Sequence, residues 1–208
     1  HINPSFGDIQ IIDSNAASTT QVLFREILSA NIDIDKNIAN CLMTGLITDT
    51  GRFQYSNTDN EVFEIASKLM LSGAELTSIS DNIYGSIPMN AIKLQSEVLN
   101  RIELHKEEEL VVSYVLQEDY LNYNIESSET DFLIDSIRLV KESSVALLLK
   151  EQEDKSFKGS LRSRNELDVQ QIASLFGGGG HKAASGFSTN LSMEEIKNKV
   201  KNAIKSQV

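Results

Sequence analysis

Residues 176–187 read FGGGGHKAASGF, with four consecutive glycines directly before a histidine and a lysine. Each glycine loses more conformational entropy on folding than other residues, so the run indicates that the backbone itself needs room. Consecutive glycines let backbone N–H groups line a concavity and let a ligand approach the main chain. A flexible connector is the alternative, but it does not need the small residues that come next. The candidate binding residues are Gly177, Gly178, Gly179, Gly180 and His181.

Two arginines lie just upstream, in the sequence KGSLRSR at residues 158–164. Arg162 and Arg164 are two positions apart, so in a strand they project from the same face. Guanidinium groups placed in this way can fork onto a phosphate or stack on a base. A solvated strand edge is the alternative, and the nearby glycine run favours a binding site.

Asp49 lies in the sequence GLITDTGRFQYSNT, at a turn after an apolar helical stretch. The neighbouring sequence supplies no further metal ligand. From the residues alone, a turn or capping role and a metal-ligand role both stay open for Asp49.

Cys41, the single cysteine, lies in an apolar run and is expected to be a buried thiol.

Short strands and amphipathic helices are expected to position these residues. Alternation of polar and apolar residues predicts a strand over residues 8–13. Helical periodicity is present in residues 14–30, 35–50, 60–74 and 89–109. Beyond residue 109 the pattern is mixed, with strands over 110–116, 145–152 and 157–163 and helices over 130–141, 168–176 and 192–207. Ser192 and Glu195 have the spacing of a capping box at the start of the last helix.

The composition narrows the class of protein. The chain has 208 residues, 40% hydrophobic and 24% charged, which fits a folded chain with a real core. No apolar run approaches the length of a membrane span, and no signal peptide is expected. The net charge of −11 argues against non-specific binding of long nucleic acid, but it allows a small anionic ligand or divalent metals beside carboxylates. A single cysteine fits a reducing cytoplasm and excludes a disulfide within the chain.

Together these segments resemble the DHH/DHHA1 phosphoesterases, in particular the nano-RNase and pAp-phosphatase branch of bifunctional oligoribonucleases, and more distantly the RecJ exonucleases. The resemblance covers nearly the whole chain. GSLRSRNELDVQQIASLFGGGGHKAASGF resembles the substrate-binding end of the DHHA1 domain, and GLITDTGRFQYSNT is similar to the family's fourth motif. HINPSFGDIQIIDSNAAST resembles the family's segment at the Asp-His-His signature, with His1 as the last residue of that triplet. The family's first motifs would then lie upstream of His1.

The resemblance implies an α/β fold: the C-terminal part of a parallel-sheet DHH catalytic lobe in residues 1–88, a connecting helix in 89–109, and a smaller α+β DHHA1 lobe in 110–208. It implies two-metal hydrolysis with Mn²⁺, in which Asp49 is a metal ligand and His1 contacts the scissile phosphate. Arg162, Arg164, the glycine run and His181 would surround the nucleotide.

The implied substrates are short RNA oligonucleotides and pAp, with no membrane partner, in the cytoplasm. Three questions stay open at this point. The chain alone is either part of an enzyme or a nucleotide-binding module without catalysis. The substrate is either an oligoribonucleotide with pAp or a cyclic dinucleotide. A homodimer is one open arrangement.

Overall fold

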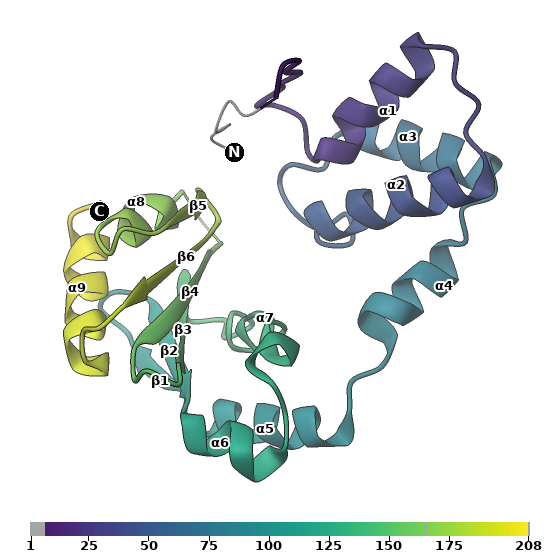
Figure 1. The fold of residues 1–208 in the computed structure, drawn as a ribbon. Helices are drawn as coiled ribbons and strands as arrows, with labels where there is room; N and C mark the ends of the chain where they lie inside the picture. The colour runs from purple at the N-terminus through teal and green to yellow at the C-terminus, as the bar shows by residue number, and fades with distance from the viewer. Residues whose placement is uncertain (1–6, 165, 208) are drawn as a thin grey trace. The chain divides into compact units, whose positions relative to one another are not determined.

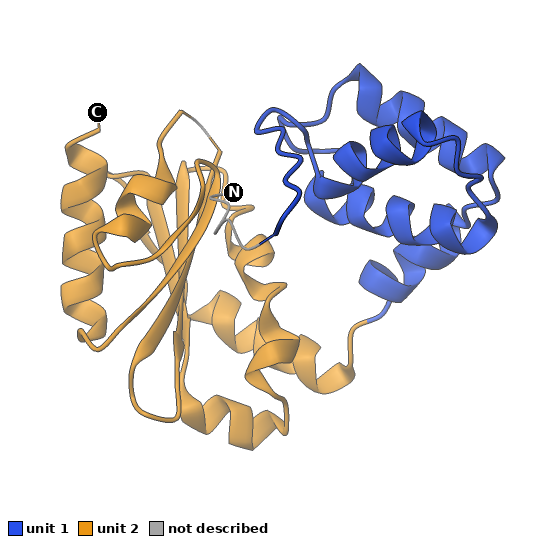
Figure 2. Cartoon of the chain, turned by 45° about the horizontal axis from the view of Figure 1, so that its top comes forward, with its two compact units in different colours: residues 1–86 blue, residues 87–208 orange. Residues whose placement is uncertain are grey.

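A computed structural model describes residues 7–164 and 166–207 of the chain. The chain divides into two compact units, residues 1–86 and residues 87–208, coloured separately in Figure 2. Each unit has its own hydrophobic core, and the mixed α/β class expected from the sequence is confirmed.

The described part of the first unit is helical. Its elements are α1 (Thr19–Ser29), α2 (Lys36–Asp49), α3 (Asn60–Leu71), α4 (Leu76–Ser80) and the π-helical turn η1 (Asp81–Gly85). Ser18, Asp35 and Asp59 begin the first three helices, and each side chain accepts a backbone N–H of the first turn. The core of the unit lies between these helices, and its fully buried members include Ala39, Met43, Leu46, Val62 and Leu69.

Two expectations for this unit are wrong. Residues 8–13 form no strand, and Ile9 and Ile11 are exposed. A strand needs a partner for its backbone groups, and the described residues of this unit contain no other strand. Cys41 is exposed rather than buried, because α2 turns the opposite side, with Leu42 and Leu46, toward the core.

The second unit contains a six-stranded sheet in the order β1-β2-β3-β4-β6-β5. The strands are β1 (Glu103–His105), β2 (Leu110–Val115), β3 (Val145–Glu151), β4 (Phe157–Ser163), β5 (Gly179–His181) and β6 (Ala184–Thr189). Only β2 and β3 pair in parallel, and the other neighbours are antiparallel. Strand β5 is therefore an edge strand, made from the second half of the glycine run.

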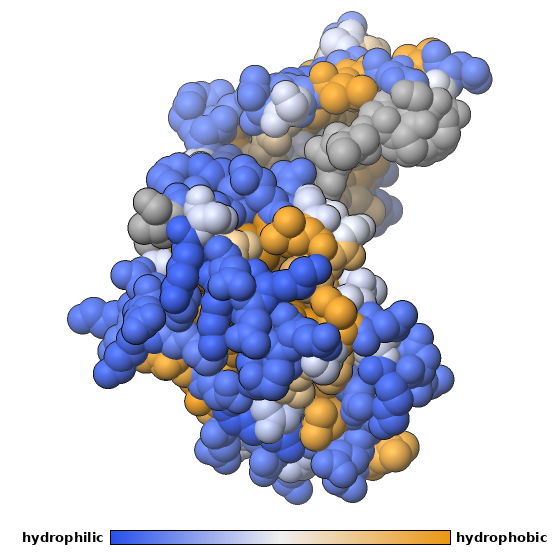
Figure 3. All heavy atoms as spheres, turned by 90° about the vertical axis from the view of Figure 1, so that its left-hand side faces the viewer, coloured by the Kyte–Doolittle hydropathy of each residue, from blue (hydrophilic) through white to orange (hydrophobic). Residues whose placement is uncertain are grey.

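Helices cover the sheet on both faces (Figure 1). One face packs on α8 (Val169–Ser174) and α9 (Met193–Lys205), through residues such as Leu147, Leu161 and Phe187. The outward side of α9 is hydrophilic (Figure 3). The other face packs through Val111, Ala146 and Leu148 on the remaining helices, which are α5 (Met89–Asn100), α6 (Gln117–Tyr123) and α7 (Leu133–Ile137). A short 3-10 helix, η2 (Ser127–Thr130), connects α6 to α7.

Two helices of the second unit are shorter than predicted. The helix expected over residues 89–109 ends at Asn100, and His105, which lies within the predicted range, is in β1. The helix expected over 130–141 is reduced to α7.

Arg101, just after α5, forms a bidentate ion pair with Asp119 of α6 at 2.6 and 2.9 Å. Burial works against the charged form of Asp119, but the ion pair together with a hydrogen bond from the backbone N–H of Leu116 outweighs it and lowers the pKa of this carboxyl.

Other predictions for this unit are confirmed. The strands predicted over 110–116, 145–152 and 157–163 form with nearly those bounds. The capping box is present at the start of α9, where Ser192 and Glu195 each accept a hydrogen bond from the other's backbone N–H. No helix in the described ranges is both long and apolar enough to cross a membrane.

Gly159 of β4 is required by an aromatic stack on the α8–α9 face. A Cβ at this position would lie 2.2 Å from Cζ of Phe187, whose ring is buried and stacks on Phe176 with centroids 4.1 Å apart. We expect Gly159→Ala to lower the free energy of unfolding by about 1–3 kcal/mol, because the ring must move within a packed core. Urea unfolding monitored by circular dichroism measures this change. Ser160→Ala, on the opposite face of the same strand, is the control, and an unchanged midpoint for Gly159→Ala would contradict the prediction.

Candidate functional site

The register of three strands places Arg162 and His181 in one row across the sheet. Arg162 of β4 pairs with Ala184 of β6, and Ala184 pairs with His181 of β5. Residues that pair directly across strands project from the same face of the sheet. Two strand spacings of about 4.8 Å separate the backbones at Arg162 and His181, with the small side chain of Ala184 between them.

The next row on the same face is smaller still. Ser160 pairs with Gly186, and Gly186 pairs with Gly179. None of the residues in these two rows is buried, whereas Ala146 and Leu148 of β3 on the same face are buried under helices. We call these two rows the open strip, and its residues are Ser160, Arg162, Gly179, His181, Ala184 and Gly186. The strip is a floor of small side chains between an arginine and a histidine.

Three of the four consecutive glycines are explained by the fold itself. Gly177 has φ of +75°, and the N–H groups of Gly177 and Gly178 return to Ser174 and Ala173 in a Schellman-type end to α8. A Cβ at Gly178 would lie 2.2 Å from the carbonyl oxygen of Gly186. Gly180 has φ of +145°, and a Cβ there would lie 2.6 Å from the carbonyl oxygen of Ala184.

Gly179 is different. A Cβ at this position would meet nothing within 4 Å, and its φ is not in the left-handed region. Its side of the strand is exposed and belongs to the open strip. The packing of the described residues therefore gives no reason for a glycine here. Of the four glycines, Gly179 is the one where a Cβ would be accommodated without strain or a collision.

Arg162 and Arg164 make different hydrogen bonds. Arg162 is half-buried on the open strip, and one guanidinium N–H donates to the carbonyl oxygen of Leu161 at 3.0 Å. Arg164 lies beyond the end of β4 and donates to the carbonyl oxygens of Val140, at 3.3 Å, and Arg138. The guanidinium of Arg164 is thus hydrogen-bonded to the segment after α7, whereas the side chain of Arg162 lies beside the small side chains of the open strip.

His181 ends β5, and its carbonyl oxygen accepts a hydrogen bond from Oγ of Ser185 at 2.7 Å. The ammonium of the adjacent Lys182 donates to the carboxylate of Glu166 at 2.5 Å. This ion pair raises the pKa of Lys182 and lowers that of Glu166, so the charge of Lys182 is already matched. Arg162 and His181 are the side chains that flank the floor.

Asp49 lies in the first unit, as the last residue of α2, and is exposed. The turn after it is unusual, because Gly51, Arg52 and Phe53 all have φ between +55° and +63°. Two non-glycine residues in the left-handed region cost conformational energy, and such strain often occurs at functional sites. The turn is held by packing: Phe53 stacks on Phe63 at 5.5 Å, and the guanidinium of Arg52 lies 4.8 Å from the ring centroid of Tyr84.

The position of Asp49 fits a cation but does not complete a metal site. A carboxylate at a helix C-terminus faces the negative end of the helix dipole, which a bound cation would offset. Asn57 donates to the backbone carbonyl of Asp49 at 3.1 Å and fixes the end of the helix. Among the described residues, however, no group of three or more His, Cys, Asp or Glu side chains could hold a metal ion. His1, the other candidate catalytic residue, lies outside the described residues.

Comparison with known proteins identifies the second unit. Residues 107–206 match the DHHA1 domain. The bifunctional oligoribonuclease and PAP phosphatase NrnA of Thermus thermophilus is 31% identical over 207 residues, covering 99% of this chain and 62% of that protein. Residues 107–206 form a DHHA1 domain, and the chain as a whole is similar to NrnA.

Further relatives agree with this assignment. A probable bifunctional oligoribonuclease and PAP phosphatase NrnA of Streptococcus mutans is 27% identical, covering 96% of this chain and 64% of that protein. The crystal structure of an exopolyphosphatase-related protein from Bacteroides fragilis has a TM-score of 0.89 and 27% identity, covering 99% of this chain and 62% of that one. The chain thus spans less than two thirds of the length of each of these DHH/DHHA1 relatives.

The sequence predicts Arg162, His181 and the glycine run as candidate binding residues, and the structure adds the small side chains that lie between them. The signal was present as period-2 alternation in β4 and β6. Gly159, Leu161 and Phe187 are buried, and the positions between them carry Ser160 and Gly186. Small and polar residues at alternate positions, opposite a buried face, indicate a sheet face that stays uncovered.

The glycines can be separated by their effect on stability. We expect Gly180→Ala to lower the free energy of unfolding by about 1–3 kcal/mol, because the Cβ would collide with the backbone of β6. Gly179→Ala should leave it unchanged or raise it by about 0.4–1 kcal/mol, since alanine reduces the entropy of the unfolded chain. Chemical denaturation of the two variants beside the unmodified chain measures both. Equal destabilisation by both substitutions would show that Gly179 is also needed for packing.

Proposed function

We propose that this chain is part of a metal-dependent phosphoesterase that hydrolyses short oligoribonucleotides to mononucleotides and removes the 3′-phosphate of pAp. The open strip of the DHHA1 domain carries the proposal, because it sets Arg162 and His181 beside a floor with room at Gly179. The named activities of the NrnA relatives support it.

The chemistry of the strip suits a terminal nucleotide. The Arg162 guanidinium would donate charge-assisted hydrogen bonds to a phosphate, and His181 would add a donor at the opposite side of the floor. The absent side chain at Gly179 would let a sugar or phosphate lie against the backbone of β5. The net charge of −11 disfavours a long polyanion, so a site for one terminal nucleotide fits the chain better than a track along a polymer. Arg164 is proposed as an outer contact, since part of its guanidinium is already engaged.

The proposed cofactor is Mn²⁺, with Asp49 as one of its ligands. Bound metal would activate water and stabilise charge on the phosphoryl group, as in two-metal hydrolases. Carboxylates and imidazoles are suitable ligands for Mn²⁺. The proposed role of His1 is contact with the scissile phosphate. Asp49 alone does not make a two-metal centre, and the described residues contain no group of three or more side chains that could hold a metal ion.

Two other functions compete with this proposal. The lack of a group of three metal-ligating side chains in the described ranges favours a nucleotide-binding module without catalysis. A phosphodiesterase of cyclic dinucleotides would use the same arginine and floor. Product analysis with pAp, RNA dinucleotides and cyclic dinucleotides, each with and without Mn²⁺, separates the three functions.

Binding of pAp to the chain tests the site directly. We expect Arg162→Ala to weaken pAp binding by about 1.5–3 kcal/mol, the contribution of a hydrogen bond to a charged group. Gly179→Ala should weaken binding while the fold stays intact. Isothermal titration calorimetry gives the affinities, and amide shifts of Gly179 and Gly180 show the location. Lys106→Ala, in the turn at the opposite edge of the sheet, is the charge-matched control. Unchanged affinity in Arg162→Ala would remove this residue from the site.

Hydrolysis is expected to behave differently from binding. The 208-residue chain should bind pAp but release mononucleotides from RNA dinucleotides only slowly with Mn²⁺, because a metal with too few ligands is neither held nor positioned. Chromatographic product analysis measures the rate, with Asp49→Ala as the control. Rapid turnover that Asp49→Ala abolishes would show that the metal site is complete in this chain.

A further inference from the structure

The face of β4 that carries Arg162 has a second cation, Lys158. The two residues lie four positions apart in the strand, so their side chains project from the same face of the sheet. Lys158 pairs with Ser188 of β6 and thus adds a third row beside the two rows of the open strip. Its side chain is exposed, and its ammonium forms no hydrogen bond or ion pair within the described residues. A cation without a counter-charge in the described chain therefore lies along the same sheet face as the proposed nucleotide site.

The charge of Lys158 is unfavourable for the fold itself. Its partner in β3 is Lys150, and like charges directly opposite each other destabilise a sheet. The ammonium of Lys150 is buried and donates to the carboxylate of Asp131 at 2.6 Å and to Oγ1 of Thr130 at 3.1 Å. Burial lowers the pKa of Lys150, the ion pair with Asp131 opposes that effect, and the charge of Lys158 adds to the lowering. Lys150 thus has its counter-charge inside the fold, and the charge of Lys158 does not contribute to the packing of the described residues.

The spacing of Arg162 and Lys158 fits two phosphates of one oligonucleotide. Four residues of a strand span about 13 Å, which is comparable to about two phosphate-to-phosphate steps of an extended single strand. Ser160 lies between the two cations on β4, and the paired positions of β6 carry Ala184 and Gly186. A nucleic acid strand would therefore meet only small side chains between the two charges. A mononucleotide such as pAp is one step long, so it would reach Arg162 without reaching Lys158.

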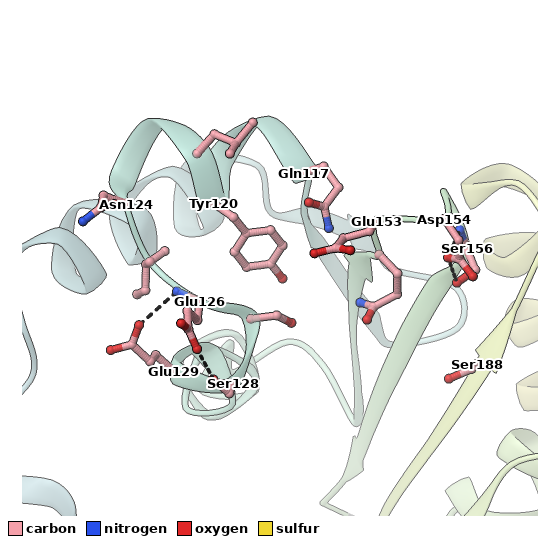
Figure 4. A pocket seen from close by; sticks show the side chains of 14 residues that line it. Gln117, Tyr120, Asn124, Glu126, Ser128, Glu129, Glu153, Asp154, Ser156 and Ser188 are labelled. Carbon is pink, nitrogen blue, oxygen red and sulfur yellow. Dashed lines mark hydrogen bonds between the residues drawn. The ribbon is translucent and has the colours of Figure 1, made fainter.

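Negative charge lies beyond the Lys158 end of the strip. There β4 leads back into the β3–β4 turn with Glu153 and Asp154, and Figure 4 shows Ser188 and Asp154 on the same side of a cavity. The cavity has a volume of about 1230 Å³, and Glu126 and Glu129 line its other side. None of its described lining residues is a lysine or an arginine. A further nucleotide would find space here, but its phosphate would approach carboxylates of like charge.

We propose that Lys158 is a specificity residue of the nucleotide site, which binds the phosphate two steps from the one at Arg162. The carboxylates beyond it would then limit the favourably bound RNA to about three nucleotides, because each further phosphate adds repulsion instead of a contact. This inference rests on the proposed function of the open strip. It adds a preference for length, which Arg162 and His181 alone do not provide.

Calorimetric titration of the chain in EDTA, with pAp, pApApA and the corresponding pentanucleotide as ligands, tests the role of Lys158. We expect pApApA to bind more tightly than pAp. Lys158→Gln should weaken pApApA binding by about threefold or more, as for an exposed ion pair, and should leave pAp binding unchanged. The slope of log K against log salt concentration for pApApA should become shallower by about 0.7, the value for one phosphate contact on a single strand. The unfolding midpoint should stay the same or rise, because repulsion of Lys150 is removed.

Lys106→Gln is the matched control, since it removes the same exposed charge at the opposite edge of the sheet. It should leave the affinity for pApApA unchanged. An equal loss in both variants, or equal weakening of pAp and pApApA by Lys158→Gln, would overturn the proposal. Absence of binding by all three ligands would overturn the nucleotide site and this proposal with it. Normal pAp binding, with pApApA affinity unchanged in Lys158→Gln, would overturn only the role of Lys158.

The double variant Glu153→Gln with Asp154→Asn tests the limit on length. In the unmodified chain we expect the pentanucleotide to bind no more tightly than pApApA. In the double variant it should bind more tightly than pApApA, because the carboxylates that repel its outer phosphates are gone. Tighter binding of the pentanucleotide by the unmodified chain, or no gain in the double variant, would show that these carboxylates do not set the length.

Discussion

The close approach of β5 to β6 is the constraint on which the proposed site depends. Carbonyl oxygens of β6 lie where Cβ atoms of Gly178 and Gly180 would be, so β5 can pair at this edge only with glycine at both positions. That pairing carries His181 into register with Ala184 and Arg162. On the reverse face, the ring of Phe187 stacks on that of Phe176. This contact holds together the two ends of residues 176–187, which contain the glycine run. The site is thus positioned by a sheet edge rather than by a mobile loop.

This arrangement changes the meaning of the glycine run. A run of four suggests a uniform cradle for an anion, yet the four positions are used differently. Gly177 ends a helix, Gly178 and Gly180 allow two strands to approach, and Gly179 leaves open space above the sheet. Close packing of the backbone and access for a ligand are separate requirements, and they are met by adjacent residues. The pairing of β5 with β6 also reduces the conformational entropy that a ligand would have to remove on binding.

The two units differ in how their strand-like segments are partnered. The sheet of the second unit is covered on one face by α8 and α9 and partly on the other by α5, α6 and α7, and its exposed strip is polar or small. The first unit leaves Ile9 86% exposed, and Ile9 belongs to residues 8–13, which have the alternation of a strand but no strand partner among the described residues. Charge is also distributed unevenly. Arg162 and His181 mark one part of the second unit, and the exposed carboxylates Glu126, Glu129, Glu153 and Asp154 mark another.

The sequence by itself determined features that depend on local patterns. The strands of the second unit, the capping box of Ser192 and Glu195, and the family resemblance arise from short-range periodicity and from a long run of matching residues. Cys41 shows that an apolar stretch of sequence does not by itself predict burial. The helices packed against α2 decide which side of it is buried, and Cys41 is on the exposed side. Only the tertiary structure decided that Arg162 and His181 share a row and that Arg164 is hydrogen-bonded to the segment after α7. Each of these depends on which distant segments pair or pack together, and spacing along one chain does not contain that information.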